Sequence, residues 1–240
     1  MTCGCAAATI RCMTAGAPTT SRRQWLVPAG LVALALVPVL AGAVRLVELS
    51  GGAAVLEPPH SAGAPVPLAV HIVSALAFTV VGAFQFVPGT RGRRPRWHRV
   101  TGRIAAPAGL VAALSGLWLT FVITGADGGL LTAFRAAAGA GMAVALALGV
   151  AAILRRDVRR YRAWMLRGYA IGIGAGTQVF TAGLGMALLG EPGPTAEALL
   201  MGAGWAVNLA VAEWLIRRKP PGRRRPSPTA GLRPAAERVG

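Results

Sequence analysis

Three histidines, His60, His71 and His98, are the side chains of this chain best suited to bind a metal or to move a proton near neutral pH. Two imidazoles on opposite sides of one iron could hold haem b. His71 and His98 cannot do this together, because about 16 residues of one hydrophobic run would separate them by roughly 24 Å along a helix. His60 and His71 could meet if the Pro-rich segment EPPHSAGAPVP folds inward. Haem b is thus an open alternative to a simpler interpretation, in which His71 hydrogen-bonds to a neighbouring helix.

Two short segments place Arg beside Trp, His and Tyr at helical spacing. The segment WHRVTGR begins at Trp97, and the segment YRAWMLRGY begins at Tyr161. The simple interpretation is a pair of interfacial anchors, since basic and aromatic side chains favour the membrane boundary. The more specific hypothesis is an anion site, with acidic lipid headgroups as its nearest ligand and His98 as a proton donor or ligand. The candidate residues of this site are His98, Arg99, Arg103, Tyr161, Arg162, Trp164 and Arg167.

A second set of candidates lies within the hydrophobic runs, where polar side chains are few. These intramembrane candidates are His71, Gln85, Gln178 and Asn208. Gln178 and Asn208 are expected near the membrane midplane, where an interhelical hydrogen bond is the simplest role. Glu213 lies near a helix end and can pair with Arg217. No Asp, Glu or Lys is expected at mid-depth, which argues against a transporter coupled to ions or protons.

Glycines recur at four-residue spacing in one run, at Gly168, Gly172 and Gly176, and so share one face of a continuous helix. Small residues at this spacing usually let two helices approach closely. The alternative is a Gly-lined cavity, which would suit a small-molecule transporter.

The composition explains why these residues need a membrane to position them. The chain has 240 residues, of which 54% are hydrophobic and 14% charged, with a formal net charge of +17. A disordered basic tail would be poor in aliphatic residues, and a soluble nucleic-acid binder would carry its charge over one compact core. We therefore predict a polytopic membrane protein with no nucleic-acid partner.

Six runs are long and apolar enough to cross a hydrocarbon core of about 30 Å as helices. The fold class is therefore an all-α, polytopic membrane helix bundle. Pro38 falls in the middle of the first run and should kink that helix. The runs are residues 26–47, 67–87, 104–124, 132–154, 165–189 and 198–216.

The basic residues predict the orientation of the six runs. The two tails and the second and fourth connections hold 23 of the 25 Lys and Arg residues, and the other three connections hold only Arg45 and Arg135. Because cytoplasmic segments are enriched in Lys and Arg, both termini should be cytoplasmic. The expected location is the bacterial cytoplasmic (inner) membrane.

The organisation is a six-helix transmembrane domain over residues 26–216 between two tails. Residues 1–25 and 217–240 are expected to be disordered and cytoplasmic. Cys3, Cys5 and Cys12 lie in the first tail, where a reducing environment disfavours a disulfide and no fourth ligand suggests zinc. Met13 is an alternative start that would remove them. No metal site is predicted.

Residues 67–216 resemble the bacterial membrane proteins of the domain of unknown function 2306 family. The resemblance rests on HI at 71–72, GAFQF at 82–86, HRVTGR at 98–103 and RAWMLRGYA at 162–170. It implies an integral membrane protein without an established activity. The family pattern has a His three residues before the Trp of the last motif, where this chain has Tyr161. If a pair of cytoplasmic histidines binds metal or haem in the family, this chain retains His98 and lacks the second ligand.

The leading hypothesis is a multi-pass membrane protein, non-enzymatic or uncharacterised, whose basic cytoplasmic face contacts anionic lipids. No signature of a soluble enzyme is found, so no catalytic residue is assigned. The first alternative is a membrane redox protein that binds haem b or a quinone, and the second is a small-molecule transporter. Assembly into a homo-oligomer is left open.

Overall fold

The computed structural model describes residues 23–56, 63–85, 95–122 and 129–218, and within these ranges the chain is all helical. The predicted helix-bundle class is therefore confirmed. His60, the three cysteines and most of both tails lie outside the described residues. The helices are α1 (Arg23–Leu49), α2 (Pro65–Phe84), α4 (Pro95–Val122), α5 (Leu130–Leu154), α6 (Val158–Gly172), α7 (Gly174–Leu189) and α8 (Pro194–Arg217).

The helices provide five spans, and a sixth if a bent pair is counted as one. Helices α1, α2, α4, α5 and α8 are each long and apolar enough to cross a membrane. Helices α6 and α7 meet this test together, with a bend of 43° between them. The expectation of one helix over 165–189 is wrong in two ways. The helix begins at Val158 and breaks at Ile173, between Gly172 and Gly174, because glycine is a weak helix former.

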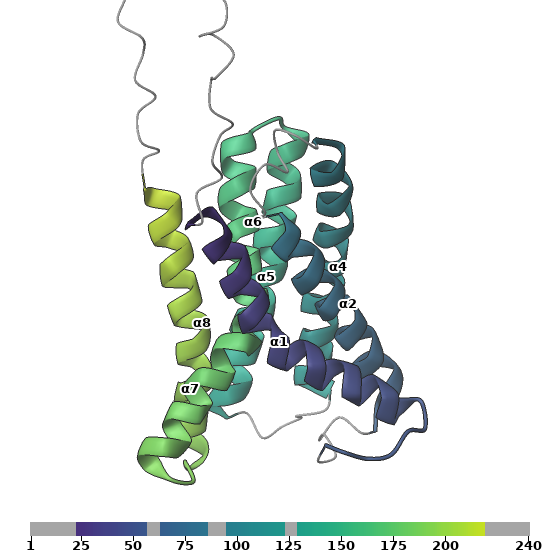
Figure 1. Cartoon of the computed structure of the whole chain (residues 1–240), viewed down its shortest axis with the longest axis vertical. Coiled ribbons are helices and arrows are strands. Elements are labelled where there is room, and N and C mark those ends of the chain that lie inside the picture. The colour runs from purple at the N-terminus through teal and green to yellow at the C-terminus, as the bar shows by residue number, and fades with distance from the viewer. Residues whose placement is uncertain (1–22, 57–62, 86–94, 123–128, 219–240) are drawn as a thin grey trace, which may run out of the picture.

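Pro38 and Pro107 lie well inside the helices α1 and α4. Helix α1 is continuous through Pro38 and changes direction part-way along its length (Figure 1). Pro107 lies inside α4, a helix that also remains continuous. Neighbouring helices in a bundle can accommodate prolines in this way.

The first and last described helices have their outer termini at the same end of the bundle (Figure 1). We call this the basic end, and it comprises the start of α1, the start of α4, the α5–α6 turn and the end of α8. The end of α1, the start of α2 and the α7–α8 turn lie at the opposite end. This alternation is the one expected for an even number of spans.

The core is centred on Phe78 and Leu146, the largest fully buried side chains. The Phe78 ring lies 5.6 Å from that of Tyr169 between centroids, and the Tyr169 hydroxyl donates to the carbonyl of Thr79 at 3.2 Å. A Cβ added at Gly168 would lie 2.8 Å from Leu146 Cδ2, and one at Gly172 would lie 2.5 Å from Phe78 Cε1. These two glycines therefore serve close packing, as the simpler interpretation predicted.

Gly176 departs from the predicted glycine face. It follows the break at Ile173, and a Cβ there would contact the backbone of Leu34 in α1. A single face through all three glycines required an unbroken helix, so that prediction is wrong for Gly176. At Gly168, Gly172 and Gly176, atoms of neighbouring helices occupy the space that a Gly-lined cavity would need.

Candidate functional site

The basic end carries a dense set of exposed arginines. Among the described residues its acidic side chains are Asp157 and Glu213, both half-buried. At the opposite end, Arg45 pairs with Glu48 at 2.7 Å, and exposed Arg135 lies on the same end as exposed Glu191 and Glu197. The exposed arginines of the basic end are Arg96, Arg99, Arg103, Arg155, Arg156, Arg159, Arg160, Arg162, Arg217 and Arg218.

The α5–α6 turn holds an arginine in an unusual backbone conformation. Arg156 has φ 60°, and among described non-glycine residues it alone has a positive φ. The amide of Asp157 donates to the carbonyl of Ala152 at 2.9 Å, which closes the end of α5. Glycine is the usual residue at this position of a helix terminus because side chains disfavour the left-handed region. The chain therefore keeps a positive charge here at a backbone cost of about 1 kcal/mol.

Three predicted residues come together where α2, α4 and α6 meet. The side-chain amide of Gln85 donates to the carbonyl of His98 at 3.3 Å and to the hydroxyl of Thr101. The Tyr161 hydroxyl faces Gly102, where an added Cβ would lie 3.6 Å from it. Gln85 was expected among the intramembrane residues, and the structure joins it to the segment of His98.

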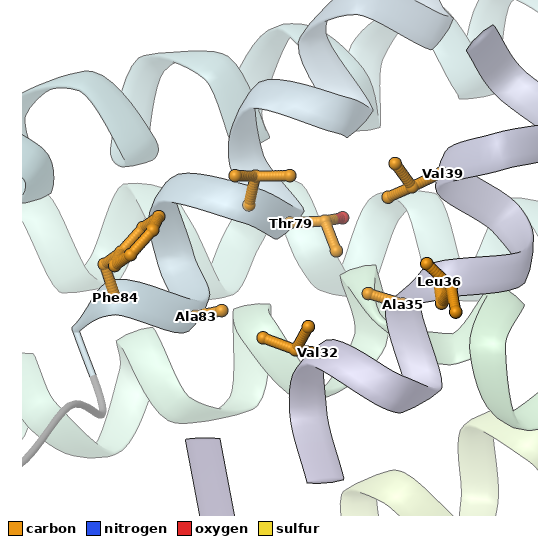
Figure 2. Close-up of a pocket in the computed structure, with 8 residues that line it drawn as sticks. Val32, Ala35, Leu36, Val39, Thr79, Ala83 and Phe84 are labelled. Carbon is orange, nitrogen blue, oxygen red and sulfur yellow. The ribbon is translucent and has the colours of Figure 1, made fainter. Parts of the chain in front are cut away.

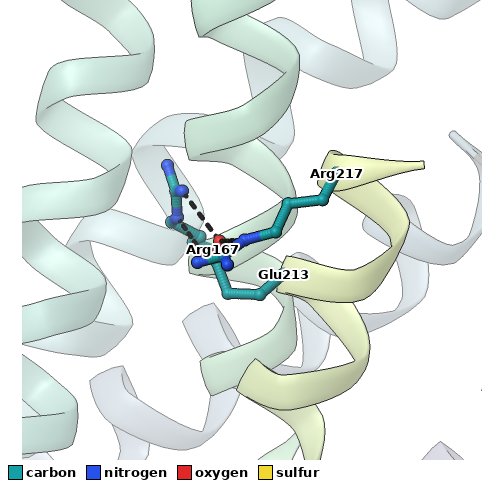
Figure 3. Close-up of polar contacts among 3 residues, drawn as sticks. All are labelled: Arg167, Glu213 and Arg217. Carbon is teal, nitrogen blue, oxygen red and sulfur yellow. Dashed lines mark hydrogen bonds and ion pairs between the residues drawn. The ribbon is translucent and has the colours of Figure 1, made fainter. Parts of the chain in front are cut away.

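Arg167 is engaged in an ion pair that joins α6 to α8 (Figure 3). Its Nε and Nη2 donate to the two carboxylate oxygens of Glu213 at 2.5 and 3.2 Å. Arg217 approaches the same carboxylate at 3.6 Å, which confirms the expected pairing. The guanidinium of Arg167 also lies 4.6 Å from the ring centre of Trp164. Of the predicted anion-site arginines, Arg167 is thus already paired within the protein.

Asn208 connects the two halves of the broken span. Its Nδ2 donates to the carbonyl of Ala170 in α6 at 3.1 Å, and its Oδ1 accepts from the hydroxyl of Thr177 in α7 at 2.8 Å. Gln178 donates separately to the carbonyl of Met201 at 3.1 Å. The expected interhelical hydrogen bonds are confirmed, each with its own partners. Asn208 thus gives the carbonyl of Ala170 a hydrogen-bond donor close to the helix break. Inside a lipid bilayer no water is available to do so.

His71 lies far from the basic end. Its Nδ1 is 3.0 Å from the carbonyl of Ala112 and 3.2 Å from the hydroxyl of Ser115, both in α4. This confirms the simple interpretation of His71 as a residue bonded to a neighbouring helix. His71 precedes Gln85 by 14 residues, or roughly 21 Å of helix, so it cannot join His98 at one site. Within the described ranges, no group of three or more His, Cys, Asp or Glu is placed to hold a metal ion.

The comparisons with known proteins identify the family. The model of a family described as "predicted membrane protein (DUF2306)" matches residues 68–216, and the chain belongs to this family. The match covers the last five spans, including the segments around His98 and Trp164. Searches of curated proteins and of solved structures each return no match. The chain is therefore a multi-pass membrane protein that lies in a lipid bilayer, and the haem, quinone and transport hypotheses stay predictions.

Proposed function

We propose that this protein lies in the bacterial cytoplasmic membrane with its basic end on the cytoplasmic side, where its arginines bind anionic lipid headgroups. The observation that carries the proposal is the concentration of exposed arginines at one end of the bundle. Each basic residue near an anionic surface contributes about 1 kcal/mol. Exposed charges are screened by salt, so the preference should weaken at high ionic strength.

Arg156 supports a role for charge at this end. The chain uses glycine at 32 positions, yet it has arginine at a turn whose φ of 60° favours glycine. Neighbouring Arg155, Arg159 and Arg160 are also exposed. Repulsion among them is unfavourable unless anions are nearby, and lipid phosphates at the membrane surface provide such anions.

Arg156→Gly is the sharpest test of lipid binding, because glycine fits this backbone conformation and the variant should fold at least as well. Affinity for phosphatidylglycerol, measured by titration into the detergent-solubilised full chain, should fall about fivefold at low salt. Arg135→Gln, at the opposite end, is the matched control and should bind as the unmodified protein does. Equal affinity in all three proteins, or no preference over phosphatidylcholine, would overturn the proposal.

The orientation has its own test. In a variant whose Cys3, Cys5 and Cys12 are replaced by Ser, single cysteines are introduced as Arg218→Cys and Glu191→Cys. A membrane-impermeant thiol reagent applied to spheroplasts should label the cysteine at 191 and spare the one at 218. The reverse pattern would place the basic end outside.

A further inference from the structure

The carboxylate of Glu213 lies between two arginines of the basic end (Figure 3). Arg167 donates to both of its oxygens, and Arg217 of the same helix approaches it at 3.6 Å. The guanidinium of Arg167 also lies over the ring of Trp164. An arginine between an aromatic ring and an anion is a common arrangement in phosphate recognition. Here the protein itself supplies the anion.

Glu213 binds Arg167 in the way that a phosphate would. Nε and Nη2 of Arg167 each donate to a different carboxylate oxygen, and a guanidinium makes the same two parallel bonds to a phosphate. Glu213 lies about 6 Å before the end of α8. It is followed by Trp214, a residue type that favours the level of the lipid headgroups. The Glu213 side chain is 32% exposed, so a headgroup can reach this position.

The other acidic side chain described at the basic end makes a looser pair. The carboxylate of Asp157 is 3.5 Å from Nε of Arg160. The side chain of Arg160 is 76% exposed, whereas that of Arg167 is 26% exposed. Water and salt screen exposed charges much more than half-buried ones. Arg167 therefore offers an anion the stronger site of the two, and Glu213 occupies it.

We propose that Glu213 is an internal competitor of anionic lipid, because its carboxylate takes the position at Arg167 that a headgroup phosphate would otherwise occupy. This inference rests on the proposed function, which places anionic lipid at the basic end. It adds a division of that end into two parts. Glu213 closes the α6–α8 side to headgroups, whereas exposed arginines such as Arg156 remain available to them.

The test measures the affinity for phosphatidylglycerol by titration into the full chain in neutral detergent. In Glu213→Gln the amide keeps the size of the side chain but leaves Arg167 without its anion. The affinity should rise about fivefold at low salt. Most of the gain should persist at high salt, because Arg167 is half-buried.

Asp157→Asn is the matched control, since it removes the same charge at the same end and asparagine caps a helix as well as aspartate does. Its gain should stay below about twofold, because it frees an exposed arginine, and should vanish at high salt. Equal gains in Asp157→Asn and Glu213→Gln would show a general effect of net charge and would reject the internal competitor.

Glu213→Asp tests the same contact without a change in charge. Its side chain is one methylene shorter, so it cannot keep both bonds to Arg167 in place, and the remaining charge protects the fold. The affinity for phosphatidylglycerol should rise about twofold, by part of the gain of Glu213→Gln. An affinity equal to that of the unmodified protein would contradict the inference.

Two further comparisons separate the possible results. If Arg156→Gly lowers the affinity and neither Glu213 variant raises it, the inference fails and the proposed function stands. If none of these variants changes the affinity, both fail. Inorganic phosphate, which has no acyl chain, should bind Glu213→Gln far more weakly than phosphatidylglycerol does. Comparable affinities would assign the position at Arg167 to free anions and reject the competition with lipid.

Discussion

The α6–α8 and α1–α2 helix pairs are held together in different ways. Helices α6 and α8 are joined by the ion pair of Arg167 with Glu213 and by the hydrogen bond from Asn208 to Ala170. Between α1 and α2 lies an apolar groove of about 230 Å³ (Figure 2). It is lined by Val32, Ala35, Leu36 and Val39 of α1 and by Thr79, Val80, Ala83 and Phe84 of α2. Both pairs lie in the same bundle, yet one has directional polar contacts and the other has space between its helices.

This difference follows from the solvent. In lipid, apolar contact between helices gains little over contact with acyl chains, so association depends on close packing and polar bonds. The pair with polar bonds has one preferred geometry. At the α1–α2 groove, acyl chains compete with the protein for contact. We therefore expect substitutions near α6 and α8 to affect stability more than substitutions in the groove.

The largest effect should come from overpacking the contact of α6 with α2. In Gly172→Leu the new side chain must displace Phe78 and Met142, whose atoms lie 2.5 and 3.2 Å from the position of an added Cβ. The free energy of unfolding, measured by SDS titration in mixed micelles, should fall by about 3 kcal/mol. Gly183→Leu is the matched control, because no atom lies within 4 Å of its added Cβ. If both variants lost a similar free energy of unfolding, the loss would come from replacing glycine itself and not from overpacking.

The next effect should come from breaking the ion pair. Arg167 and Glu213 are each about a quarter to a third exposed. In Glu213→Gln, Arg167 loses its carboxylate partner at this half-buried position. The same titration should show a loss of about 2 kcal/mol. Exposed Glu197→Gln in the same helix should change little. The double variant Arg167→Gln/Glu213→Gln should recover part of the loss, and strict additivity would contradict a direct coupling.

A smaller effect is expected at the helix break. Asn208→Leu removes two hydrogen bonds and Gln178→Leu removes one. At about 0.6 kcal/mol for each bond in a membrane, the losses should be about 1.2 and 0.6 kcal/mol. A loss for Asn208→Leu no larger than that for Gln178→Leu would contradict its role in joining α6 and α7.

The smallest effect should come from the groove. Leu36 is 53% exposed, and Leu36→Ala should change the free energy of unfolding by at most about 0.5 kcal/mol. A loss comparable to that of Glu213→Gln would show that α1 and α2 pack as tightly as α6 and α8.

The sequence predicted the features that depend on composition along the chain. Hydrophobic length was enough to find the spans, and the clustering of arginines anticipated the basic end. The start of α6 at Val158 was missed because VRRYRAW is too polar for a hydrophobic run, although it is helical. The pairing of Glu213 with Arg167 joins residues 46 positions apart and needed the tertiary structure. The groove was missed because residues such as Val80 have the same character whether they pack against protein or line a space.

The most direct test of the central claim, that one end of the bundle selects anionic lipid, uses two tryptophans of α4. Trp97 lies at the basic end and Trp118 near the opposite end, 63% and 42% exposed. In variants that keep only one of them, with the others replaced by Phe, quenching by brominated phosphatidylglycerol and by brominated phosphatidylcholine is compared. Trp97 should report a preference for phosphatidylglycerol of about fivefold at low salt, and Trp118 should report none. The same ratio at both tryptophans would contradict the account.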